Sequence, residues 1–125
     1  MLGRPCIAFE MKDAEKAYKH FDLEIIESLG DTYEGINLHV WTDRERILHR
    51  CKRCGGYILT QIDEIHDIEF GDYYYCDHFP VSGSEEAKKI NQNYNGFQIE
   101  ESFPGKWMIC DPDQVPYWRE RNVDE

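Results

Sequence analysis

The sequence predicts an α+β fold: one mainly antiparallel sheet of about six or seven strands, two short helices and a zinc-knuckle hairpin. Runs rich in β-branched and aromatic residues, separated by turn-forming residues, occupy most of the chain and indicate strands. Two stretches have helical spacing instead, and a C-x-x-C pair stands between two of the strand runs. With 125 residues, the chain is expected to form a single domain over residues 1–125 with one core, and a polar tail from about residue 111.

The helices are expected to begin after Asp13 and after Ser82. Asp13 can accept hydrogen bonds from the first turn of the first helix, whose apolar residues have the spacing i, i+3, i+4, i+7. These apolar residues are Ala14, Ala17, Tyr18 and Phe21. Ser82 and Glu85 have the S-x-x-E spacing of a capping box, and Gly96 is expected just past the end of the second helix. The apolar stripe of that helix consists of Ala87, Ile90 and Tyr94.

The strands follow from runs of β-forming residues that end at turn formers. The expected strands are residues 23–29, 36–42, 46–51, 57–65, 73–81, 97–103 and 106–110. The third and fourth flank the C-x-x-C pair and are expected to form a hairpin. The last two are expected to form another hairpin around Pro104-Gly105.

Charge limits the classes of partner. The net charge is −11, and the acidity is concentrated in residues 54–125, which hold 15 acidic and 5 basic side chains against 10 and 9 in residues 1–53. Such a C-terminal part repels a phosphate backbone, so nucleic acid is not the expected ligand there. No apolar run is long enough for a membrane span and the N-terminus lacks signal-peptide features, which predicts a cytoplasmic protein with no membrane partner.

The cysteine content indicates metal or free thiols. Five cysteines are an odd number, and nothing suggests export, so a disulfide framework is the poorer interpretation. Cys51-Lys52-Arg53-Cys54-Gly55-Gly56 has the form of a zinc knuckle, whose tight turn directs both sulfurs to one point. Gly tolerates the left-handed backbone after the second ligand, and the two basic residues favour thiolate over thiol.

A structural zinc ion needs four ligands, so a second pair is required. Cys76 and His78 are the first candidates, because residues two apart in a strand lie on the same face. His66 is the alternative fourth ligand if the turn at residues 69–71 places it diagonal to Cys76. Two other interpretations stay open: Cys76 as an ordinary core residue, and a redox-active C-x-x-C pair.

The remaining cysteines and histidines lack ligand spacing in the sequence. Cys6 and Cys110 are expected to be half-buried thiols. His20, His39 and His49 are expected on the surface or in the core, with no part in a metal site.

Through Cys51, Cys54, Gly55 and Cys76, the middle third of the chain resembles the zinc ribbon and zinc knuckle group. The resemblance implies a structural Zn²⁺ ion. The sequence departs from the usual second C-x-x-C of that group, having Cys76-Asp77-His78 instead. Because of this departure, the resemblance does not identify the fourth ligand.

The predicted function is a non-enzymatic, acidic protein-binding domain with a structural zinc site, of the immunity or antitoxin type, that inhibits a basic partner protein. The candidate contacts with the partner are Asp63, Glu64, Asp67, Glu69, Asp72 and Trp118. One alternative is a nucleic-acid-associated zinc-ribbon module that uses the basic cluster between Arg44 and Arg53. Another is a metal-dependent enzyme, although the sequence has no recognisable catalytic motif.

Overall fold

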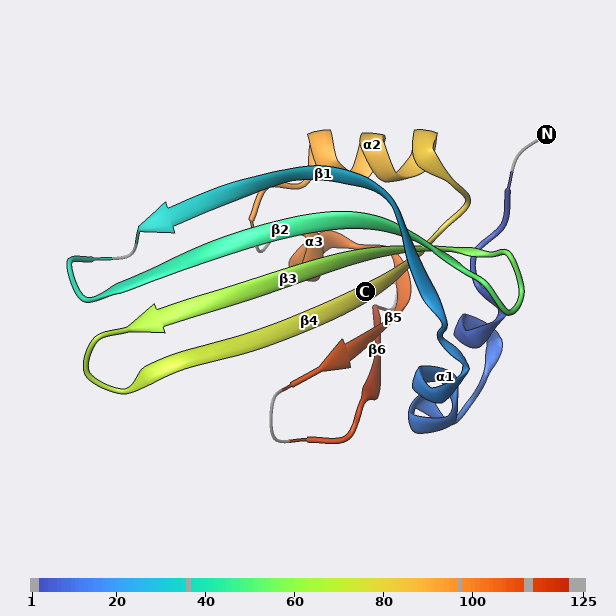
Figure 1. Cartoon of the computed structure of the whole chain (residues 1–125), viewed down its shortest axis with the longest axis horizontal. Helices are drawn as coiled ribbons and strands as arrows, with labels where there is room; N and C mark the ends of the chain where they lie inside the picture. The colour runs from blue at the N-terminus through green and yellow to red at the C-terminus, as the bar shows by residue number, and fades with distance from the viewer. Residues whose placement is uncertain (1–2, 36, 97, 112–113, 122–125) are drawn as a thin grey trace.

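Among the residues that the computed structural model describes (3–35, 37–96, 98–111 and 114–121), six strands form one antiparallel sheet in the order of the chain, β1 to β6. The strands are β1 (Leu23–Gly35), β2 (Val40–Cys51), β3 (Tyr57–Asp67), β4 (Gly71–Val81), β5 (Gly105–Cys110) and β6 (Tyr117–Arg121). The helices are η1 (Ile7–Glu10), α1 (Ala14–His20), α2 (Ser84–Asn93) and α3 (Gln98–Ser102). The predicted α+β class with a mainly antiparallel sheet is confirmed (Figure 1).

Several element boundaries differ from the prediction. Residues 40–42 of the expected strand 36–42 join the expected strand 46–51 in the single strand β2, because the charged residues between them pair in register with β3. Residues 37–39 lie outside the strand, and residue 36 lies outside the described residues. Residues 98–102 form the helix α3 instead of a strand, while Phe97 lies outside the described residues. The tail expected from about residue 111 contains β6, which pairs with β5. α2 begins at Ser84, and its N-cap is Gly83 without a side-chain cap, so the capping box expected from Ser82 and Glu85 is wrong.

The sheet is covered on both faces at one end. One face, which we call the helical face, packs against α2 and α3 through Leu59, Phe79 and Trp107. The opposite face, the N-terminal face, packs against η1 and α1 through Ile58 and Met108. Ile58 and Leu59 are adjacent in β3 and therefore point to opposite faces, so each strand contributes to both cores.

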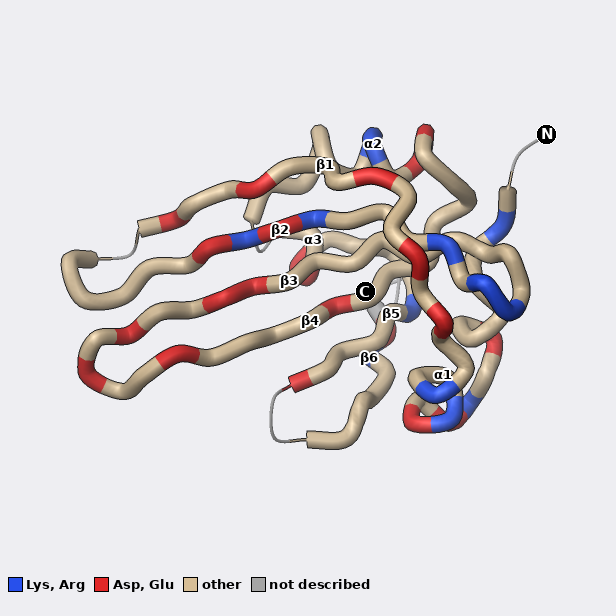
Figure 2. Tube along the Cα trace, viewed as in Figure 1, with Lys and Arg blue, Asp and Glu red and all other residues tan. Residues whose placement is uncertain are grey.

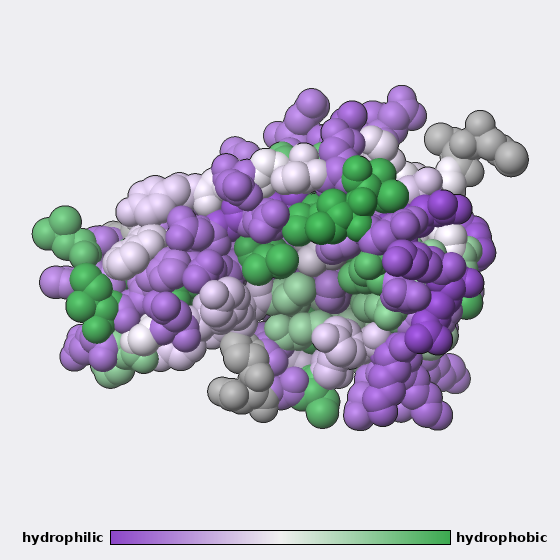
Figure 3. All heavy atoms as spheres, in the orientation of Figure 1, coloured by the Kyte–Doolittle hydropathy of each residue, from purple (hydrophilic) through white to green (hydrophobic). Residues whose placement is uncertain are grey.

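The other end of the sheet projects beyond all the helices (Figure 1). It consists of the free ends of the β1–β2 and β3–β4 hairpins, and we call residues 31–35, 37–43 and 64–75 the tip. The backbone N–H of Ile68 donates to the carbonyl of His39 at 2.9 Å and joins the two hairpins. Apolar side chains gather at this end, among them Leu38, which is 90% exposed, and Phe70, which is 70% exposed (Figure 3).

No helix among the described residues is both long enough and apolar enough to cross a membrane.

Candidate metal centre and partner surface

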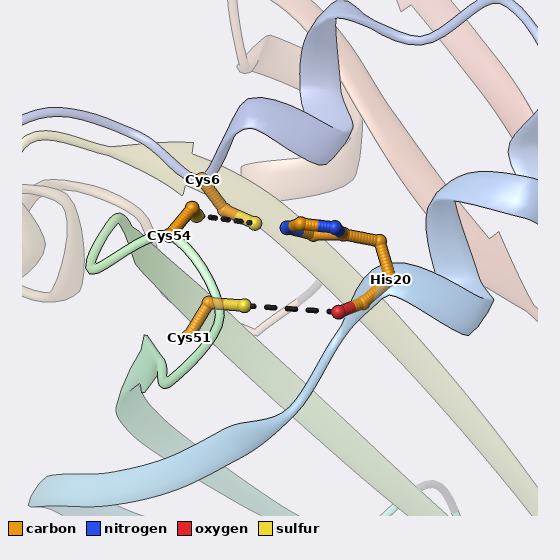
Figure 4. A group of neighbouring side chains, drawn as sticks. All are labelled: Cys6, His20, Cys51 and Cys54. Carbon is orange, nitrogen blue, oxygen red and sulfur yellow. Dashed lines mark hydrogen bonds between the residues drawn. The ribbon is translucent and has the colours of Figure 1, made fainter.

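The C-x-x-C turn is built by the end of β2 and the start of β3. Cys51 is the last residue of β2, and its N–H donates to the carbonyl of Gly56 at 2.8 Å. The N–H of Gly55 donates in turn to the carbonyl of Cys51 at 2.7 Å, and Gly55 has a φ of +76°, a conformation that glycine adopts without strain. This closed turn directs the side chains of Cys51 and Cys54 to the same side of the loop (Figure 4).

The N-terminal segment runs beside this turn and brings Cys6 to it. The N–H of Cys6 donates to the carbonyl of Tyr57 at 3.1 Å, and the N–H of Tyr57 donates to the carbonyl of Arg4 at 2.9 Å. The approach is so close at Gly56 that a Cβ atom there would lie 2.4 Å from Cα of Cys6. Only glycine fits at position 56, because the backbone of the N-terminal segment occupies the space that a side chain would need.

His20 arrives from the end of α1. Asp13 caps the start of this helix by accepting hydrogen bonds from the N–H groups of Glu15 and Lys16, so the prediction of a helix behind Asp13 is confirmed. After the helix, the carbonyl of Asp22 accepts a hydrogen bond of 2.8 Å from the N–H of Lys52. This bond ties the chain that follows His20 to the C-x-x-C turn.

The four side chains form a group with the dimensions of a metal site. One ligand atom from each of Cys6, His20, Cys51 and Cys54 lies within 4.8 Å of all the others, and the Sγ atoms of Cys6 and Cys54 are 3.6 Å apart. A tetrahedral zinc ion with Zn–S bonds of about 2.3 Å separates its sulfur ligands by about 3.8 Å. The imidazole of His20 points toward the sulfurs (Figure 4). This set of three thiols and one imidazole could hold zinc in a closed, four-ligand site.

A buried nitrogen supports the fit to a cation. Nε2 of His20 is inaccessible to solvent and has no hydrogen-bond partner among the described residues. A buried polar atom is normally satisfied, and a metal ion bound between the thiols would satisfy this nitrogen.

Electrostatics favour a thiolate at Cys54. Burial raises the pKa of this thiol, but the ring of His20 and the backbone N–H groups of Ile7 and Gly56 outweigh burial and lower the pKa to about 6. Burial raises the pKa of Cys6 far above its usual range, and the neighbouring thiols Cys51 and Cys54 raise it further. A divalent cation would be needed to stabilise several thiolates at once in this group.

The structure does not bring Cys76 and His78 to the C-x-x-C turn, which corrects the expected second pair of ligands. The register pairs Tyr57 with Val81, so Val81 is the β4 residue beside the turn, whereas Cys76 pairs with Ile62, five residues further along β3. At the usual strand rise this is about 16 Å from Tyr57.

His78 and His66 have other partners. Nδ1 of His78 lies 2.9 Å from Oγ1 of Thr60, and burial, together with the charge of His49, lowers the pKa of His78 to about 3. His66, the alternative ligand, lies at the tip between Asp43 and Asp72, with 3.0 Å from a ring nitrogen to each carboxylate.

Sequence reasoning missed Cys6 and His20 because their spacing to the C-x-x-C pair follows no local rule. The knuckle turn explains Gly55 but not Gly56. The second glycine was the available signal, since a glycine without a local role often marks a close approach of another backbone.

The predicted partner contacts do not all lie on the surface. Asp63 is fully buried and accepts a hydrogen bond from Nε of Arg44, so it is not available to a partner. Trp118 packs against Phe9 with 6.0 Å between ring centroids, and its Nε1 donates to the carbonyl of Lys12, so it serves the fold. The other predicted contacts lie at the tip and are at least partly exposed: Glu64, Asp67, Glu69 and Asp72.

The tip is uniformly acidic. Its residues include seven carboxylates and no lysine or arginine (Figure 2). Exposed aromatic and aliphatic side chains lie among them: Tyr33, Leu38, Ile68, Phe70, Tyr73 and Tyr74. Exposed apolar side chains surrounded by negative charges are typical of a surface that binds a positively charged protein.

The basic cluster predicted between Arg44 and Arg53 is divided in the structure. Arg44 and Arg46 are buried beneath the helical face and bond to protein groups. Only Arg50, Lys52 and Arg53 are exposed, around the C-x-x-C turn.

No family model, curated protein or solved structure matches the chain.

Proposed function

We propose that the chain is a non-enzymatic protein-binding domain with a structural zinc ion at one end of its sheet and a surface for a basic partner protein at the other. The zinc ion would be held by Cys6, His20, Cys51 and Cys54. When bound, it supplies a crosslink that fastens the N-terminal segment and α1 to the β2–β3 turn. The convergence of these four side chains on one point, with a buried and unpaired nitrogen at His20, supports this site.

The tip is the proposed partner surface. Its composition supports this assignment most directly, because exposed apolar side chains lie among carboxylates with no lysine or arginine. Carboxylates steer a cationic partner to the surface, while exposed rings such as Phe70 supply the apolar contact area that makes binding tight. Inhibition of a basic protein, in the manner of immunity proteins and antitoxins, is the form of this function that the size and charge of the chain favour.

The same features disfavour the two alternatives. A nucleic-acid module needs exposed cations, whereas Arg44 and Arg46 are committed to buried contacts. An enzyme would need an open metal position or an activated nucleophile, and four protein ligands leave no open position on zinc. The neighbouring thiol and imidazole of Cys76 and His78 do not form such a nucleophile, because burial raises the pKa of the thiol and lowers that of the imidazole.

The experiment for the metal is elemental analysis of the full chain purified without chelators, which should give one zinc per chain. For the partner, proteins that bind the immobilised chain at low salt are identified, purified and measured by calorimetry. The proposal expects a partner with a pI above about 9, whose affinity falls steeply with salt.

A matched pair of double variants tests the surface. Glu69→Gln with Phe70→Ala removes one charge and one exposed side chain from the tip, and should weaken binding by about tenfold or more if Phe70 is an anchor. Glu85→Gln with Ile25→Ala makes the same kind of change away from the tip, since Ile25 is 68% exposed and Phe70 is 70% exposed. Equal loss of affinity in both variants would refute the tip as the partner surface.

A further inference from the structure

Three carboxylates from three different elements meet on the helical face of the sheet. Asp63 belongs to β3, Asp77 to β4 and Glu100 to α3, and one oxygen of each lies within 4.8 Å of the other two. Asp63 is 0% exposed and Asp77 is 2% exposed, while Glu100 is half-buried. We call these three residues the carboxylate cluster. It lies on the opposite face of the sheet from the proposed zinc centre.

Two guanidinium groups lie beside the cluster. Nε of Arg44 donates to Asp63, and its Nη1 also donates to Glu34 at 3.2 Å, so one guanidinium serves two carboxylates. Arg46 reaches Asp63 only through Gln61, which accepts from Arg46 at 2.8 Å and donates to Asp63 at 3.1 Å. The two guanidinium groups therefore reach the cluster at Asp63.

One atom of the cluster is unsatisfied. Oδ2 of Asp77 is inaccessible to solvent and has no hydrogen-bond partner in the described part of the chain. Burial, and then the adjacent Glu100, raise the pKa of Asp77 to about 10, so the ionised form is costly unless a positive charge accompanies it. A buried carboxylate oxygen without a partner is the position at which a cation is most strongly favoured.

We propose that Asp63, Asp77 and Glu100 form a second metal site, which binds one oxygen-preferring divalent cation such as Mn²⁺, Mg²⁺ or Ca²⁺. The donor set consists of carboxylate oxygens alone, the ligands that these hard cations prefer, whereas the thiol-rich group at the other face suits zinc. With metal–oxygen bonds of about 2.1 to 2.5 Å, oxygens on one ion lie about 3 to 5 Å apart, which matches the spread of the cluster.

The ion would connect β3 and β4 to α3, a helix of five residues that has few means of its own to stay in place. Binding is therefore expected to raise the melting temperature of the whole chain.

The test uses the full chain with its zinc content verified and other divalent ions removed by dialysis. Mn²⁺ is titrated and the free ion is followed by electron paramagnetic resonance, which should show one saturable site per chain that Mg²⁺ or Ca²⁺ competes for. NMR signals of residues beside the carboxylate cluster should broaden at low Mn²⁺ occupancy. Broadening confined to the tip, where Asp43, Glu64 and His66 also lie close together, would overturn the proposal.

Variants separate the cluster from the acidic surface. Asp77→Asn keeps the shape of the side chain but removes its charge, and should weaken Mn²⁺ binding by about tenfold or more, because ligand charge sets the affinity of such sites. Glu100→Gln, at a half-buried position, provides the same test if Asp77→Asn fails to fold. Asp43→Asn is the matched control and should leave the affinity unchanged. No saturable binding in the unmodified chain, or equal binding by the cluster variants, means that a shared proton and not a metal ion satisfies the cluster.

Discussion

Replacing Cys6 with serine is expected to remove the zinc ion and to lower the free energy of unfolding. The size of the loss depends on the length of chain between the residues that the ion connects. The sequence separation between Cys6 and Cys54 is 48 residues. A crosslink that closes a loop of this length is worth about 4 kcal/mol of chain entropy at 25 °C. For a chain of 125 residues, a loss of this size corresponds to a fall in melting temperature of about 15 °C.

The assay is differential scanning calorimetry beside elemental analysis of the same samples. Cys76→Ser is the matched control, because it removes a thiol from β4 that lies outside the four-residue group and should keep one zinc per chain. His20→Gln should behave like Cys6→Ser, since both remove a ligand. If Cys6→Ser and His20→Gln retain zinc while Cys76→Ser loses it, the metal lies at the ligand set predicted from the sequence and the present assignment is refuted.

Three further changes test how the site and the tip are built. Asp13→Ala removes the cap of α1 and should lower the free energy of unfolding by about 1 kcal/mol in denaturant titrations. Gly56→Ala places a Cβ 2.4 Å from Cα of Cys6, so it should cost more than about 1 kcal/mol and reduce zinc retention as well. Burial opposes the charge on the His66 ring, but Asp72 and its acidic neighbours outweigh burial and raise the pKa of His66 above 6.5. The stability that the charged His66 ring contributes is present below pH 6.5 and is lost as the pH rises through the pKa of His66 in the folded state. An NMR titration should show a lower pKa of His66 in Asp72→Asn than in the unmodified chain. An unchanged pKa of His66 would contradict the role of Asp72.

The sequence allowed prediction of those elements whose signals are local. The cap at Asp13 and the turn from Cys51 to Gly55 lie within a few residues of the groups that they bond, so spacing alone identified them. The sheet class was also predictable, because alternating β-forming runs with short turns leave few other arrangements.

The errors occurred where a residue's role depends on a distant partner. Two strands were expected where β2 is continuous, because residues 43–45 are charged and not β-forming, yet these residues pair with β3 and Asp63 neutralises Arg44 across the sheet. Residues 98–102 were expected to form a strand, but this short stretch packs as a helix through Ile99 against the helical face. Cys6 and His20 were missed for the same reason, because only the path of the N-terminal segment beside Tyr57 brings them to the C-x-x-C turn.

The two ends of the sheet depend on different contacts, and this separates stability from binding. The proposed zinc ion fastens the segment that covers the N-terminal face, whereas α2 and α3 cover the helical face through a core that contains none of its four ligands. The hairpin ends that form the tip project beyond both covers (Figure 1), and among the described residues only the inner end of the tip, at Glu34, approaches the chain at Gly96 after α2. Zinc removal should therefore lower the melting temperature while leaving partner affinity unchanged in calorimetry well below that temperature. An affinity that falls in proportion to zinc content would show that the ends are coupled, and would place the partner surface nearer to the C-x-x-C turn than to Phe70.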